Sequence, residues 1–211
     1  MDAAFIRAWL AEAGTAIEAQ RDHLTQLDAA IGDADHGINL ARGFSAISAA
    51  LYQAATPTPG SVLILAGSTL ISKVGGASGP LYGMALRQAG KSLGDMADAG
   101  LPELAASLEA ALAGVQKLGA AREGEKTMVD ALAPAVAALH KAISEGSDTA
   151  GALAAAAAAA AEGAQATISM QALKGRASYL GPRSVGHEDP GAASTAIIVG
   201  ALRDVAQRQA S

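Results

Sequence analysis

The chain contains no cysteine among its 211 residues, so neither a disulfide framework nor a thiolate metal site is possible. Aromatic side chains make up only 3% of the sequence and β-branched runs are few, which argues against a protein built mainly from strands. The formal net charge is −5, and the sequence has no basic stripe. These absences exclude a disulfide-stapled scaffold and give no electrostatic signature of a nucleic-acid-binding protein.

Long apolar runs and targeting signals are also missing. The most apolar window, residues 61–74, includes Lys73 and is shorter than the ~20 residues that a membrane-spanning helix needs. The alanine tract at 154–161 is too weakly hydrophobic to span a membrane. The N-terminus lacks the basic region and apolar stretch of a signal peptide. We therefore expect a cytoplasmic protein, and the length favours a single domain over residues 1–211.

Alanine and leucine are abundant, in segments of helical length that turn signals separate. This pattern predicts an all-α fold of about eight helices, and the short connections favour antiparallel packing in an up-and-down bundle. Two apolar runs, 62–65 and 196–199, also fit a buried strand, although the length of the surrounding segments favours helix. The expected helices span residues 5–27, 37–55, 61–74, 78–93, 102–118, 129–143, 149–170 and 191–207.

The most informative segment is a turn that carries Asp28, Asp33 and Asp35 and is bracketed by Gly32 and Gly37. Carboxylates this close repel one another unless a cation or proton neutralises them, and hard cations such as Mg²⁺ prefer oxygen ligands. One aspartate could cap the helix that follows, but three exceed that need. An EF-hand is excluded because no glutamate stands at the twelfth loop position. The turn predicts a magnesium site that serves phosphates beside an anion-attracting helix start.

Two further loops could contact a phosphorylated ligand. Residues 75–83 are glycine-rich and open a helix, so their amides could bind phosphate, although a tight helix–helix turn explains them equally well. This loop is not a Walker A motif, because no Lys-Ser/Thr pair follows. Residues 175–191 lack a clear helical pattern, and Arg176 or Arg183 there could neutralise phosphate charge or form a surface ion pair. Asp189 could equally cap the last helix.

Taken together and in order, four segments resemble the nucleotide-binding L subunit of dihydroxyacetone kinase, the DhaL family. They are residues 27–37, 75–83, 125–130 and 175–191, so the resemblance covers nearly the whole chain. It implies an eight-helix antiparallel barrel with the nucleotide site at one end. It also implies that two Mg²⁺ ions hold the phosphates of a tightly bound ADP.

Matching motif positions carry the family's site onto this sequence. The resemblance implies that Asp28, Asp33 and Asp35 are the magnesium ligands and that Arg176 stabilises transition-state charge. The residues implied around the nucleotide are His36, Gly37, Ile38, Asn39, Ala77, Ser78, Gly119, Met128, Arg176, Asp189, Pro190 and Gly191.

Three positions depart from the pattern of the family. Ala34 stands where glycine is common, Ile38 where threonine is common and Glu125 where aspartate is common. Ile38 removes a hydroxyl near the phosphates, so a side-chain contact is lost there while a backbone contact stays possible.

The activity that the resemblance implies is phosphoryl transfer. Dihydroxyacetone would be held on a separate K subunit, and an M subunit of the phosphoenolpyruvate-fed phosphotransferase system would rephosphorylate ADP in place. Three alternatives stay open: a kinase that exchanges ATP or uses another small ketose such as erythrulose, a nucleotide-binding module that regulates a partner such as a transcription factor, and a plain helical bundle. A homodimer is compatible with each of them.

Overall fold

The computed structural model describes residues 1–210, which form nine α-helices and two 3₁₀ helices. Within these residues the sole β-type pairing is one isolated bridge between Asp2 and Asp98, so the predicted all-α class is confirmed. The helices are α1 (Ala3–Ala19), α2 (Arg21–Ile31), α3 (His36–Gln53), α4 (Pro59–Lys73), α5 (Ser78–Leu93), α6 (Leu101–Gly119), α7 (Val129–Ser144), α8 (Thr149–Ala166), η1 (Thr167–Ser169), η2 (Arg176–Ser184) and α9 (Pro190–Ala210).

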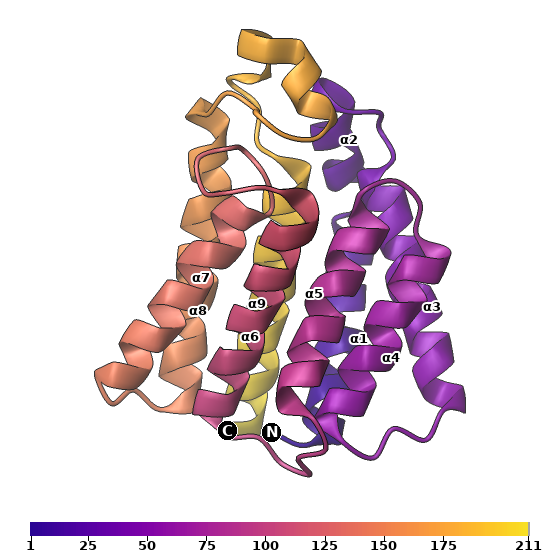
Figure 1. Ribbon diagram of the computed structural model, residues 1–211, viewed down its shortest axis with the longest axis vertical. Helices are drawn as coiled ribbons and strands as arrows, with labels where there is room; N and C mark the ends of the chain where they lie inside the picture. Colours follow the sequence, from indigo (N-terminus) through magenta and orange to yellow (C-terminus); the bar gives the residue numbers. More distant parts are fainter. Residues whose placement is uncertain (211) are drawn as a thin grey trace.

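Long helices pack side by side with alternating direction. Contacts run from α1 to α3, then in order through α4, α5, α6, α7 and α8 to α9, which returns to pack against α1. Both chain termini lie at the lower end of the molecule in Figure 1, and η2 lies at the upper end. As a consequence α3, α5, α7 and α9 all begin at the upper end. This order of contacts favours the barrel, which stays a prediction.

The core is continuous across all nine α-helices, because each contributes buried apolar side chains to one cluster. Trp9 on α1 is buried, and its indole Nε1 donates a hydrogen bond of 2.9 Å to the Ile198 carbonyl on α9. Small residues allow close helix contacts elsewhere: a side chain at Gly60 would overlap the Gly94 carbonyl at the end of α5. None of the helices within residues 1–210 is both long enough and apolar enough to cross a membrane.

The helix count differs from the expected eight because the segment predicted at 5–27 is two helices, broken at Gln20. No proline or glycine marks this break, and the apolar spacing from Ile17 to Leu24 continues across it. Residues 62–65 and 196–199, which also fitted a strand, lie within α4 and α9. Part of the 175–191 loop is the 3₁₀ helix η2, and the helix predicted to reach residue 170 ends at Ala166.

Candidate functional site

A cavity of about 290 Å³ opens at the upper end of the molecule, where four helices begin. Its wall includes the first residues of α3, α5, α7 and α9, namely His36, Ser78, Val129 and Pro190. The first N–H groups of a helix have no acceptor within the helix, and its N-terminus carries the positive end of the helix dipole. Four helix starts around one cavity therefore favour an anionic ligand.

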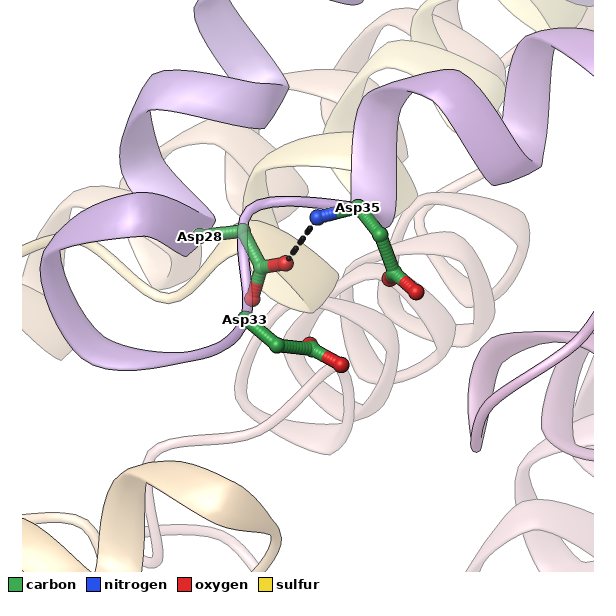
Figure 2. A group of neighbouring side chains, drawn as sticks. All are labelled: Asp28, Asp33 and Asp35. Atoms are coloured by element: carbon green, nitrogen blue, oxygen red, sulfur yellow. Dashed lines mark hydrogen bonds between the residues drawn. The ribbon is translucent and has the colours of Figure 1, made fainter.

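The three aspartates of the predicted metal site come together at this cavity (Figure 2). One ligand oxygen from each of Asp28, Asp33 and Asp35 lies within 4.8 Å of the others. Asp28 is buried, and its Oδ2 accepts hydrogen bonds from the N–H groups of Asp35 at 2.9 Å and His36 at 3.1 Å. Asp28 thus shapes the turn that presents the other two carboxylates.

Local backbone requirements explain the sequence of this turn. A side chain at Gly32 would overlap the Asp28 carboxylate, so only glycine fits there without displacing it. Ala34 has a φ of 62°, in the left-handed region that glycine occupies without strain. The glycine that is common at position 34 in the resembled family would suit this conformation better than the alanine of this chain.

The donor set fits a hard divalent cation. All three groups offer carboxylate oxygens, which suit Mg²⁺ or Ca²⁺ rather than a soft metal. Three negative charges so close also need a positive partner. The Arg176 guanidinium supplies part of that charge, because its Nη2 lies 3.0 Å from Asp33 Oδ2.

The floor of the cavity is a chain of hydrogen-bonded side chains. The Ser78 hydroxyl lies 3.0 Å from His36 Nδ1, and His36 Nε2 lies 2.8 Å from the Ser194 hydroxyl. The Tyr82 hydroxyl lies 2.7 Å from Ser194 and donates to the Gly191 carbonyl at 2.9 Å. Burial lowers the pKa of His36 and raises that of Tyr82, so both are neutral at pH 7. The chain fixes the starts of α3, α5 and α9 relative to one another.

Two buried charged residues, Lys126 and Asp189, also line the cavity. Lys126 is 1% exposed, and its Nζ donates hydrogen bonds to the carbonyls of Thr167, at 2.6 Å, and His187. Burial lowers the pKa of Lys126, and nearby carboxylates oppose this shift. Burial raises the pKa of Asp189 to about 7, although the Ala192 amide and the Lys126 ammonium favour its charged form. The cavity therefore carries a titratable group at the start of α9.

The remaining wall is apolar and was not identified from the sequence, apart from Met128. It includes Leu81 on α5, Val115 on α6 and Val129 on α7. An apolar surface beside an anion-attracting end suits a nucleotide, because the base and the phosphates need opposite surroundings.

Twelve of the fifteen predicted site residues line the cavity. The other three, Gly37, Ile38 and Asn39, lie in the first turn of α3 but do not line it. A side chain at Gly37 would overlap the Arg21 carbonyl, so this glycine allows α2 to pack on α3. Ile38 is 51% exposed, and the Asn39 carbonyl Oδ1 accepts a hydrogen bond of 2.9 Å from Arg42.

Several lining residues were missed by the sequence reasoning. Lys126 falls inside the 125–130 segment and Lys174 directly precedes the 175–191 segment, so their charge was the available signal. The apolar members carried none, because a cavity wall and a core face have the same helical spacing. The missed residues are Ile31, Gly32, Gly76, Leu81, Tyr82, Val115, Ala121, Lys126, Thr127, Val129, Lys174, Gly175 and Ala177.

Comparison with known proteins decides the family. The family model described as the DAK2 domain matches residues 30–204. The chain belongs to the DAK2 domain family. This DAK2 protein is 43% identical over 186 residues to the ADP-binding subunit DhaL of the PEP-dependent dihydroxyacetone kinase of Escherichia coli (strain K12), which covers 88% of this chain and 89% of that subunit. It is 42% identical over 194 residues to a DhaL subunit of Listeria innocua, with 92% of both chains covered.

A solved structure agrees with this assignment. The dihydroxyacetone kinase from C. freundii, in complex with AMP-PNP and Mg²⁺, matches this DAK2 protein with a TM-score of 0.73 and 28% identity. The match covers 95% of this chain and 34% of that kinase. The DAK2 fold therefore extends over nearly the whole chain, which corresponds to about a third of the larger enzyme.

Proposed function

We propose that this chain is the ADP-binding, phosphoryl-transferring subunit of a dihydroxyacetone kinase. In this proposal it forms one cytoplasmic DhaL-type domain over residues 1–211. Dihydroxyacetone is held on a separate K subunit. An M subunit of the phosphoenolpyruvate-dependent phosphotransferase system rephosphorylates ADP in place. The single observation that carries the proposal is the meeting of three carboxylates with four helix starts at one cavity.

The site residues have separate roles in this proposal. Asp28, Asp33 and Asp35 hold two Mg²⁺ ions, which neutralise charge on the phosphate oxygens when bound. The first-turn N–H groups of Gly37 and Ile38 lie next to this turn. They form part of the positive end of the α3 dipole, which faces the phosphates in this proposal. Ala77, Ser78 and the residues from Asp189 to Gly191 surround the phosphates from the other helix starts, while Gly119 and Met128 contact the base.

Arg176 is the proposed catalytic residue. Its position 3.0 Å from Asp33 puts a permanent positive charge beside the proposed metal ligands. Phosphoryl transfer needs positioning and charge neutralisation more than a nucleophile or base from this chain. The hydroxyl that accepts the phosphoryl group belongs to the ketose on the K subunit, so no substrate pocket for the ketose is needed here.

Exposed apolar side chains support docking of partner subunits at the cavity end. Nine large hydrophobic side chains are exposed within the described residues, and only Tyr52 and Met96 lie near the opposite end. Soluble monomers rarely gather apolar side chains on one surface without an interaction there. The seven at the cavity end are Ile38, Ile71, Leu118, Ile168, Leu173, Tyr179 and Val185.

The first experiment is to purify the protein without added nucleotide, denature it and quantify the released nucleotide by chromatography. Near-stoichiometric ADP is expected, because a cofactor that is rephosphorylated in place does not leave. An empty site that binds added ATP weakly would instead favour a kinase that exchanges ATP.

Reconstitution with K and M subunits tests the transfer itself. We expect dihydroxyacetone phosphate to form from phosphoenolpyruvate when all components are present, and none when this chain is omitted. Transfer to no short ketose would overturn the proposal. Tight nucleotide binding together with a partner, but without transfer, would indicate a nucleotide-dependent regulator.

A further inference from the structure

Lys126 has no role in the proposed chemistry, yet its environment is unusual. It is the largest of the fully buried side chains, at 1% exposure, and charged side chains are rarely buried unless paired. Its φ of 61° is in the left-handed region, which is strained for a residue with a side chain. Both features indicate that the surrounding structure holds this lysine in one place for a purpose other than core packing.

The ammonium of Lys126 joins the two ends of one segment. Thr167 and His187, whose carbonyls accept its hydrogen bonds, lie twenty residues apart, at the start and end of the stretch between α8 and α9. We call residues 167–187 the cover segment. Two further bonds close its base: the Gly186 N–H donates to the Ile168 carbonyl at 2.7 Å, and the Asp189 N–H donates to the Thr167 hydroxyl at 2.9 Å. The cover segment is thus a loop with joined ends.

The same segment forms one wall of the cavity. Lys174, Gly175, Arg176 and Ala177 line it, and Arg176 reaches across to Asp33. The Leu173 N–H donates a 3.1 Å hydrogen bond to the Glu125 carbonyl, next to Lys126. The position of Arg176 therefore depends on how the base of the cover segment is held.

A charged donor suits this base better than an apolar residue. Two backbone carbonyls face the same point, and both would lose a charged donor if the ammonium were removed, although the Thr167 carbonyl would keep the Met170 N–H at 3.1 Å. The carboxylates of Asp189, Asp130 and Glu188 lie near enough to favour the positive charge of Lys126. A lysine at this position can therefore keep its charge despite its burial.

We propose that Lys126 is a positioning residue that clamps the base of the cover segment and so controls how long a nucleotide stays in the cavity and where Arg176 lies. The nucleotide part of this inference rests on the proposed function. The clamp itself is a property of the protein without any ligand. The two parts can therefore be tested separately.

The test compares Lys126→Met with Lys91→Met, an exposed lysine on α5 at the opposite end of the molecule. The protein is loaded with a fluorescent ADP analogue, and its release is followed after addition of excess ADP. We expect release about tenfold or more faster from K126M, because hydrogen bonds from a charged donor are lost. The K91M protein should match the wild type. Wild-type release from a folded K126M protein would overturn the proposal.

Restoring the ammonium separates the clamp from general destabilisation. Because the natural chain has no cysteine, Lys126→Cys can be alkylated with 2-bromoethylamine in denaturant and refolded, which recreates a lysine-like side chain at this position alone. The alkylated protein should release the analogue at nearly the wild-type rate, whereas the unmodified K126C protein should not. Rapid release after alkylation would contradict the clamp.

Two further measurements keep the test decisive. If K126M does not fold, Thr167→Val provides a second variant, because it removes the hydroxyl that accepts from the Asp189 N–H. Release from T167V should also be faster than from the wild type, and wild-type release would overturn the proposal.

Hydrogen exchange of ligand-free protein should be faster in residues 169–185 of K126M and unchanged in α4. If the wild type binds no ADP analogue, the proposed function fails, and this exchange pattern alone supports or overturns the clamp.

Discussion

Helices begin at both ends of the molecule, but the two ends satisfy the first N–H groups of those helices differently. At the end opposite the cavity, the side chains of Asp2, Thr58 and Asp148 each accept a hydrogen bond from the N–H three residues later. Three of the four helices that begin there, α1, α4 and α8, thus have a side-chain cap, and α6 begins at Gly100 without one.

At the cavity end, the N-cap residues of α3, α5 and α7 are Asp35, Ala77 and Met128, and none of them provides a side-chain cap. The His36 N–H instead donates to Asp28, and the Val129 N–H donates to the Thr127 hydroxyl at 3.2 Å. Where other first-turn N–H groups need a partner, a ligand with acceptor oxygens can supply it. α9 differs, because Asp189 Oδ2 accepts from the Ala192 N–H at 2.7 Å. Side-chain caps are thus present in three of the four helices that begin opposite the cavity and in one of the four that begin at it, so fewer caps compete with a ligand at the cavity end.

Removing one of the cavity-end carboxylates should have the largest effect on binding. In Asp33→Asn or Asp35→Asn, the charge that attracts a hard cation falls while the side-chain shape is kept. We expect the Mg²⁺ concentration needed for ADP binding to rise by about a hundredfold or more. Titration of Mg²⁺ at fixed ADP by calorimetry measures this. Asp95→Asn, at the capped end, is the matched control, and an equal shift in that variant would contradict the assignment.

Arg176 provides the next test of the cavity end. Replacing Arg176 with Gln should lower kcat for transfer to dihydroxyacetone by about 10²–10³-fold, because one preorganised positive charge is lost from the transition state. The affinity for ADP should change much less. Steady-state kinetics of the reconstituted system give both quantities. Arg183→Gln changes an exposed arginine of the same segment and should leave kcat near the wild-type value.

Asp189 should make the stability of the apoprotein depend on pH. The native state keeps its proton up to about pH 7, whereas the unfolded chain releases it near 3.8, so the native state binds more protons between these values. Stability therefore falls as pH rises, by on the order of 2–3 kcal/mol between pH 5 and 8. Asp189→Asn keeps an N-cap but cannot titrate. Urea unfolding at both pH values should show a flatter profile for this variant, and parallel profiles would disprove the assignment.

A cap at the opposite end should affect stability alone. Thr58 accepts a 3.1 Å hydrogen bond from the Ser61 N–H in a capping box at the start of α4. Thr58→Ala should lower the free energy of unfolding by about 1 kcal/mol. The affinity for ADP should stay the same, since the cavity is at the far end of the helices. Any change in the release of bound nucleotide would break the contrast between the two ends.

Local signals explain how much of the fold the sequence predicted. Glycine and proline mark most helix ends, so the predicted 78–93 helix matches α5 to the residue. The break at Gln20 was missed because it depends on packing: α1 packs on α9, α3 and α4, whereas α2 packs mainly on α3, at Gly37. Neither contact has a signal in the local sequence.

The same distinction applies to the site. Asp33 and Asp35 were found because their chemistry is concentrated in eight residues of sequence. Lys126 was not given a role, because its partners are backbone carbonyls 41 and 61 residues away. Any residue type supplies a carbonyl, so only the folded chain reveals such a contact.

Ala34 departs from the glycine that is common in the family, and restoring glycine there is expected to have a small effect on stability at the cavity end. Its φ of 62° is unfavourable for alanine by about 1–2 kcal/mol, and glycine removes this strain while increasing the freedom of the unfolded chain. The two terms partly cancel, so Ala34→Gly should stabilise the protein by only about 0.5 kcal/mol. Thermal unfolding measures this. Because the strain lies in the turn that holds Asp33 and Asp35, the Mg²⁺ requirement should fall slightly as well. Destabilisation by A34G would mean that the turn relaxes away from the left-handed conformation in solution.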